Sequence, residues 1–134
     1  MADNVTTQTL LDGERLVIQK FTNISDGTGE VGVVKVDVST LAPNSFGQAC
    51  TGVKINKIWS AVDGMEVRVL WVATTSLLAW VAPSNGPYLM DFSSFGGISN
   101  NSGAGKTGDI AFTTHNHTLS DSYTIILECI KTYG

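Results

Sequence analysis

Charged residues are scarce in this chain of 134 residues, because Lys, Arg, Asp and Glu together make up only 15% of it. Twelve acidic residues outnumber eight basic ones, and the formal net charge is −4. Proteins that bind nucleic acid need a basic face to neutralise phosphates, so the composition argues against nucleic acid as the main partner. Much of the surface must be polar but uncharged, which is typical of a surface that is inert or covered by other protein.

Signals for export or membrane insertion are also missing. Residues 1–4 have neither a basic region nor an apolar run, so we expect no secretory signal. The most apolar window, residues 69–82, is interrupted by Thr74, Thr75 and Ser76 and is shorter than a membrane span. We therefore expect no transmembrane helix and no membrane partner.

Cysteine is limited to Cys50 and Cys129, which are far apart in the sequence. Cys129 falls within an alternating segment that predicts a strand, and we expect two reduced thiols, with Cys129 buried. A chain of this length buries roughly two-thirds of its unfolded surface, so it needs neither a disulfide nor a metal to fold.

Helical periodicity is absent, whereas strand periodicity is strong from Val53 to Ala82. No window of helix length combines an apolar face at i, i+3, i+4 and i+7 with freedom from Gly, Pro and β-branched runs. Between Met65 and Ala73 the odd-numbered residues are apolar, which predicts that they face a core while Glu66 and Arg68 face solvent.

Three successive antiparallel strands are expected in this stretch, and each contains one tryptophan: Trp59, Trp71 and Trp80. The pair Asp63-Gly64 lies between the first two apolar runs. This dipeptide is a strong signal for a type I′ hairpin turn, which needs positive φ at both central residues.

Further strands are predicted at residues 15–24, 31–38, 88–92, 109–114 and 123–131, with a bulge at Asn56-Lys57 and long connections at 39–52 and 93–108. Eight or nine short strands indicate an all-β, antiparallel β-sandwich of the jelly-roll or Greek-key type. We expect residues 13–134 to form this single domain. Residues 1–12 are expected to form an N-terminal arm that crosses to a neighbour, or an edge strand.

A glycine-rich segment, Gly103-Ala104-Gly105-Lys106-Thr107, is similar to the end of a phosphate-binding P-loop. The full pattern requires glycine where this chain has Asn100, and it requires a following helix whose N-terminal amides hold the phosphate. A strand is predicted to follow instead. We therefore expect a glycine loop with a solvated lysine and no nucleotide cofactor.

Histidine occurs only at positions 115 and 117, two residues apart and on one face if the strand continues. Two such side chains can begin a metal site, but a third ligand would have to come from elsewhere, such as Asp109 or Asp121. The sequence places neither, so the prediction is that no metal is bound.

Catalytic groupings are not evident. Two carboxylate pairs, Asp63 with Glu66 and Glu128 with Asp109, are candidates for glycoside hydrolysis, but Asp63 already has a predicted role in a turn and Glu128 is predicted on an outer strand face. No Ser or Cys nucleophile has a placed histidine beside it. The expectation is a protein that is not an enzyme.

Exposed apolar residues are the remaining candidates for function. Phe92, Phe95 and Ile98 lie among Ser and Gly in the second long connection, where they either cap the open end of the sandwich or contact a neighbouring subunit. An N-terminal arm would bury an apolar side on a neighbour's sheet. The expected interface residues are therefore Val5, Leu10, Leu11, Phe92, Phe95 and Ile98.

Two segments carry a resemblance: VTTQTLLDGERLVIQ at residues 5–19, and GGISNN with GAGKTGDI at residues 96–101 and 103–110. Together they resemble small structural proteins of tailed bacteriophages, some of which are capsid cement or decoration proteins that sit as trimers on the head. The resemblance implies a virion protein that stabilises a capsid shell. Its partners would be the major capsid protein and two copies of itself, at the capsid surface after synthesis in the host cytoplasm.

An alternative of another class is a glycan- or receptor-binding module of a phage tail or fibre. Exposed Trp or Tyr rings stack on sugars, so the positions of the three tryptophans distinguish the two hypotheses. Buried rings favour a scaffold, and a ring exposed in a groove favours a glycan site.

Overall fold

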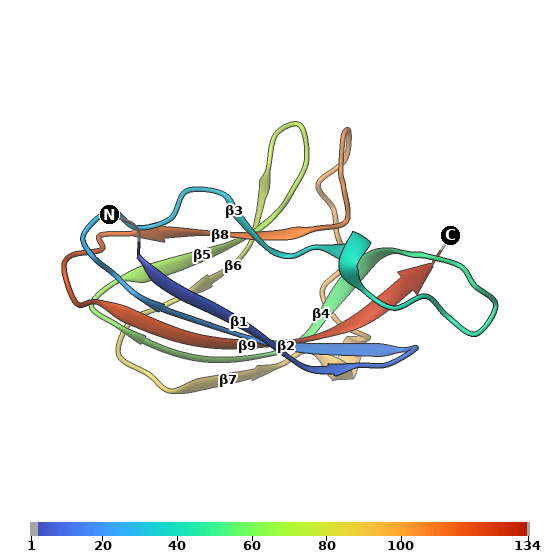
Figure 1. Ribbon diagram of the computed structural model, residues 1–134, viewed down its shortest axis with the longest axis horizontal. Coiled ribbons are helices and arrows are strands. Elements are labelled where there is room, and N and C mark those ends of the chain that lie inside the picture. The colour runs from blue at the N-terminus through green and yellow to red at the C-terminus, as the bar shows by residue number, and fades with distance from the viewer. Residues whose placement is uncertain (1–2, 134) are drawn as a thin grey trace.

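The structure is a computed structural model that describes residues 3–133 (Figure 1). Its strands are β1 (Asn4–Asp12), β2 (Leu16–Ile24), β3 (Val33–Val36), β4 (Cys50–Asp63), β5 (Glu66–Trp71), β6 (Leu77–Ala82), β7 (Tyr88–Asp91), β8 (Ile110–His115) and β9 (Ser122–Tyr133). Two short 3-10 helices, η1 (Val38–Thr40) and η2 (Ser93–Phe95), lie in the long connections. Within residues 3–133 no helix has the length and apolar character to cross a membrane.

The strands form two antiparallel sheets, which confirms the predicted β-sandwich. One sheet has the order β1-β2-β9-β4-β7 and the other β3-β8-β5-β6. Strands β2 to β9 pair first with last: β2 with β9, β3 with β8, β4 with β7 and β5 with β6. The chain is thus one long hairpin rolled into two layers, which is the jelly-roll arrangement. Figure 1 shows the layers one above the other, with β8 in the upper and β9 in the lower.

Alternation along the strands fills the space between the sheets as expected. Val67, Val69 and Trp71 of β5 are fully buried, and β9 contributes Ile125 and Leu127 from the opposite sheet. The bulge predicted at Asn56-Lys57 is confirmed, because the register between β4 and β9 shifts between Ile55 and Lys57.

The predicted hairpin at Asp63-Gly64 is wrong. Strand β4 pairs with β7 and β9, whereas β5 pairs with β6 and β8, so this turn crosses from one sheet to the other. Gly64 has φ 82°, but Asp63 is not among the residues with positive φ, and a type I′ turn needs both. The two apolar runs face one core from opposite sheets, and alternation alone does not distinguish that arrangement from pairing.

The strand predicted at residues 31–38 is shorter than expected. Strand β3 covers only Val33–Val36, with a register shift against β8 between Val34 and Val36. Val33 and Val34 are exposed, while Lys35 is buried. Lys35 turns inward because its amine lies 2.5 Å from Glu30 Oε2, a buried carboxylate.

Residues 4–12 form strand β1, which lies at the edge of the five-stranded sheet and pairs with β2 of the same chain. Asp12 at its end ties it to the domain. Lys131 is buried and donates to Asp12 Oδ1 at 2.7 Å and to the carbonyls of Gly13 and Ala42. Burial alone would lower the pKa of Lys131, but the hydrogen bond and charge of Asp12 outweigh it and raise that pKa.

Both cysteines are free, as predicted, and both are buried, which the sequence predicted only for Cys129. Burial, together with the negative charge of Glu128, raises the pKa of the Cys129 thiol to about 12. Thiolate is the nucleophilic form, so Cys129 is a core residue rather than a reactive one.

Candidate functional site

The side of the five-stranded sheet that faces away from the core, called here the outer face, carries apolar side chains among charged and threonine residues. Strand register aligns Leu89, Trp59, Ile126 and Lys20 in one row across β7, β4, β9 and β2. A second row holds Lys57, Glu128, Ile18 and Leu11, and a third holds Lys54, Ile130 and Leu16.

Water-facing sides of antiparallel sheets ordinarily carry polar residues in alternation with the apolar core set. On this outer face, Leu89 is 55% exposed and Leu11 is 46% exposed, while Trp59, Ile18 and Ile126 are partly exposed. Contiguous apolar side chains on the surface of a soluble domain mark a site of interaction. The outer face is therefore the main candidate site.

A groove of about 340 Å³ lies on the outer face beside Trp59. The residues that line it are mostly apolar or aromatic: Trp59, Ala61, Pro87, Tyr88, Leu89 and Ile126, with Ser60 and Thr124 as the hydroxyl-bearing members. Because neither a carboxylate nor an amide side chain lines it, the groove offers little to hold the hydroxyl groups of a sugar. It fits an apolar protein side chain better.

The three tryptophans have different environments. Trp71 is fully buried, with its indole Nε1 unpaired within the described residues. Trp80 packs against the core, with its ring centroid 5.1 Å from that of Phe92. Of the three, only Trp59 lines the groove. Burial of Trp71 and packing of Trp80 agree with a scaffold role, whereas the position of Trp59 agrees with the alternative, a glycan- or receptor-binding module.

The six expected interface residues fall into two groups. Val5, Leu10 and Leu11 lie on β1 and are 37%, 49% and 46% exposed. Leu10 sits where the β1–β2 register shifts, between Thr9 and Leu11. All three remain accessible along the free edge of the sheet.

The three residues of the second group, Phe92, Phe95 and Ile98, differ in their exposure. Phe92 is only 6% exposed and packs in the chain's own core, and Ile98 packs against that core while its backbone bridges to Ile55. These two residues therefore cap the open end of the sandwich, which was one of the two alternatives. Phe95 is 67% exposed and is the loop residue available to a neighbour.

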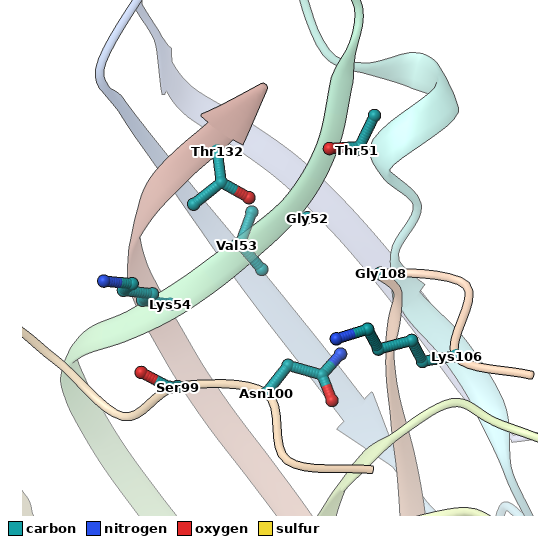
Figure 2. Close-up of a pocket in the computed structure, with 9 residues that line it drawn as sticks. All are labelled: Thr51, Gly52, Val53, Lys54, Ser99, Asn100, Lys106, Gly108 and Thr132. Atoms are coloured by element: carbon teal, nitrogen blue, oxygen red, sulfur yellow. The ribbon is translucent and has the colours of Figure 1, made fainter. Parts of the chain in front are cut away.

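The P-loop-like segment lines a second hollow, called here the loop pocket, of about 370 Å³ (Figure 2). Its walls are residues 51–54 of β4, Ser99, Asn100, Lys106 and Gly108 of the long loop, and Thr132 of β9. Strand β8 follows this segment, as predicted, so no helix N-terminus is available for a nucleotide phosphate. Lys106 is exposed, as expected, and it also lines the pocket.

Three of the four candidate carboxylates have separate structural partners, whereas Asp63 is exposed at the end of β4. Glu66 pairs with Arg68 at 2.8 Å, and both side chains are partly exposed. Glu128 Oε2 accepts from Asn56 Nδ2 at 2.7 Å, and Asp109 Oδ1 accepts from the Val38 amide at 2.9 Å. These contacts give Glu66, Glu128 and Asp109 structural roles in three separate places.

The two histidines lie at the end of β8. His117 Nδ1 is 3.1 Å from the Thr114 hydroxyl, and its ring packs against Gly29. His115 is exposed. Across residues 3–133 no group of three or more His, Cys, Asp or Glu side chains is placed to hold a metal ion.

We accordingly expect a chelator to leave the melting temperature unchanged. The measurement is thermal unfolding with and without EDTA, with His115→Ala as a companion variant. A fall of several degrees with the chelator, abolished in His115→Ala, would contradict the prediction and revive the metal site.

A buried polar cluster was missed by the sequence analysis. Asn23 and Tyr123 come from one sheet, Lys35 from the other and Glu30 from the connection between β2 and β3, and all four are buried. The sequence shows them as unrelated residues, and the even spacing of Val34 and Val36 around Lys35 predicts a solvent-facing lysine. No local signal identifies the cluster.

Comparison with protein-family models finds no matching family, and comparison with curated proteins finds no matching relative.

Proposed function

We propose that this protein is a non-enzymatic structural component of a bacteriophage virion. It binds and stabilises the capsid shell as a cement or decoration protein and associates with two further copies of itself. The observation that carries the proposal is the group of apolar side chains on the outer face. The resemblance of residues 5–19 and 96–110 to small structural proteins of tailed bacteriophages suggests that the contact is made in a virion.

The outer face approaches the size of a stable protein contact. Five strands at about 4.8 Å spacing are roughly 20–25 Å wide, and five outward positions along a central strand cover about 27 Å. The resulting face of roughly 500–700 Å² approaches the ~800 Å² per partner of a standard interface.

A trimer with one rotation axis needs two different, complementary surfaces on each copy. The outer face is one. The free edge of β1, with Val5 and Leu10 exposed, is the other, because an unpaired strand edge is a template for contact with another chain. Jelly rolls serve viral capsids, which agrees with this role, although a fold alone does not define a function.

The second candidate function is a glycan- or receptor-binding module of a phage tail or fibre. It is favoured by the partly exposed ring of Trp59 beside Tyr88 in a groove. The apolar lining of that groove makes it the weaker candidate.

Imaging of particles tests the proposal. Particles with the protein are expected to carry extra density on the head, at positions related by three-fold symmetry, and particles without it should lack that density and break at lower temperature. Density found only on the tail would contradict a capsid role and support the alternative. Unchanged particles would contradict both.

A further inference from the structure

The loop pocket contains polar groups that neither shell binding nor self-association uses. It lies between β4, the end of β9 and the loop of residues 96–108 (Figure 2). None of the nine residues that line it is acidic, and two of them, Lys54 and Lys106, are basic. In a chain with net charge −4, this makes the pocket a local positive site.

The loop wall of the pocket is fixed to the domain on both sides. The Ile98 amide donates to the Ile55 carbonyl at 2.8 Å, and the Thr107 amide donates to the Val72 carbonyl at 3.1 Å. Gly108 has φ +88°, and a Cβ there would lie 2.1 Å from the Thr51 carbonyl oxygen. Only glycine allows this approach, so the pocket is formed before any ligand arrives.

Asn100 presents a donor to the pocket. Its Oδ1 accepts from the amide and the hydroxyl of Ser102, at 3.0 and 2.6 Å, which assigns the orientation of the amide group. The Nδ2 group is therefore on the other side, and Figure 2 shows it in the same part of the pocket as the Lys106 amine. The Asn100 Nδ2 group and the Lys106 amine are both hydrogen-bond donors, so a ligand between them would need hydrogen-bond acceptor atoms.

Within residues 3–133 neither lysine of the pocket takes part in an ion pair. Figure 2 shows the Lys106 amine beside Asn100 and the Lys54 amine directed away from both, so Lys106 is the main positive charge of the pocket and Lys54 lies at its rim. Hydroxyl groups of Thr51, Ser99 and Thr132 complete the lining.

We propose that the loop pocket binds a small oxyanion that carries hydroxyl groups, of the class of sugar acids and sugar phosphates. Lysine and an amide donor hold the carboxylate or phosphate oxygens. The hydroxyl groups of the lining exchange hydrogen bonds with those of the ligand. The volume of about 370 Å³ lies within the range of small-molecule sites and exceeds what a bare phosphate fills.

The test is a titration of the full chain followed by amide NMR at constant ionic strength, with glucuronate, glucose 6-phosphate, inorganic phosphate and glucose as probes. Saturable shifts confined to residues 51–54 and 98–108 are expected for the two sugar anions, with weaker binding of phosphate and of glucose. The relative affinities of glucuronate and glucose 6-phosphate decide between carboxylate and phosphate. Glucose binding as tightly as glucuronate would overturn the requirement for an anion.

Two variants locate the site. Lys106→Ala should weaken binding about 10-fold or more, the usual effect of losing a charged hydrogen bond. Asn100→Asp keeps the acceptor for Ser102 but puts a carboxylate beside Lys106, and should abolish binding. Arg15→Ala removes one positive charge from an exposed position outside the pocket and should leave binding unchanged.

Equal weakening by Arg15→Ala and Lys106→Ala would show only a general charge effect and overturn the site. Unchanged binding in Asn100→Asp, or no saturable shift with any probe, would overturn it as well. The NMR spectra themselves report whether each variant is folded.

Discussion

Replacement of Glu30 by alanine is expected to lower the free energy of unfolding by about 3–5 kcal/mol, the range for breaking a buried ion pair from one side. The side chains of Lys35 and Glu30 are only 3% and 5% exposed, and Lys35 Nζ lies 2.5 Å from Glu30 Oε2. Without the carboxylate, a buried ammonium group would lose its partner. For a domain of this size the melting temperature should fall by roughly 10–20 °C.

Glu30 is more than one half of an ion pair. Its Oε1 accepts from the Tyr123 hydroxyl at 2.5 Å and from Asn23 Nδ2 at 3.0 Å. Its backbone amide donates to Thr114 Oγ1 at 2.9 Å. Asn23 and Tyr123 belong to the five-stranded sheet, and Lys35 and Thr114 to the four-stranded sheet, so Glu30 joins the two layers at one end of the sandwich.

Tyr123 contributes a donor that does not titrate under ordinary conditions. Burial, followed by the hydrogen bond and negative charge of Glu30, raises the pKa of its hydroxyl well above the usual value. The stabilisation linked to this shift is complete below the unfolded pKa of about 10 and is lost as the pH rises beyond it. The cluster should therefore be intact from neutral to mildly alkaline pH.

Controls separate the buried pair from a general effect of charge. Glu66→Ala removes a carboxylate from the partly exposed pair with Arg68, and should change the unfolding free energy by about 0–1 kcal/mol. Lys35→Met combined with Glu30→Ala should destabilise less than the sum of the single changes, by about 0.5–3 kcal/mol, because no unpaired charge remains. Strict additivity in denaturant unfolding would contradict this account of the cluster.

This cluster shows where sequence reasoning stops. Alternation identified the buried side of β5, and in β9 it predicted Cys129 buried and Glu128 outward, because it depends only on neighbours along one strand. It does not say which strands share a sheet, and that is why Asp63-Gly64 was read as a hairpin. The burial of Lys35 depends on Glu30, Asn23 and Tyr123 being brought together by the roll of the whole chain, and no segment near Lys35 contains that information.

The outer face was within reach of the sequence only in part. Alternation along the sequence puts Leu16 and Ile18 on one side of β2, and Ile126 and Ile130 on one side of β9. These four residues form one face because β2, the second strand of the chain, pairs with β9, the last. Such a long-range contact leaves no periodic signal, so the candidate site emerged from the topology.

Leu89→Lys is expected to convert an assembled protein into a monomer. Leu89 is 55% exposed, lies on the edge strand β7 and is paired in register with Trp59 at the groove. Burying a leucine is worth about 1.5–3 kcal/mol, and this contribution would be lost at each of the three contacts of a closed trimer. The measurement is mass in solution by light scattering across a range of concentrations.

The matched control is Leu78→Lys. Leu78 is 49% exposed and also lies on an edge strand, β6, but in the other sheet. It should assemble like the unmodified protein, and the melting temperature of the separated chain should be similar for both variants because each leucine is half exposed. An equal loss of assembly in both would indicate nonspecific association through apolar surface.

A single substitution tests the contact through the free edge of β1 better than deletion of the strand does. Deleting residues 1–12 would also take away Asp12, the acidic partner of the buried Lys131, and would destabilise the domain itself. Leu10→Lys leaves that ion pair in place and should weaken assembly as Leu89→Lys does, because the two residues lie on the two surfaces that the proposed trimer brings together. Assembly unaffected by Leu10→Lys would remove β1 from the contact. An unmodified protein that forms a dimer would contradict the trimer.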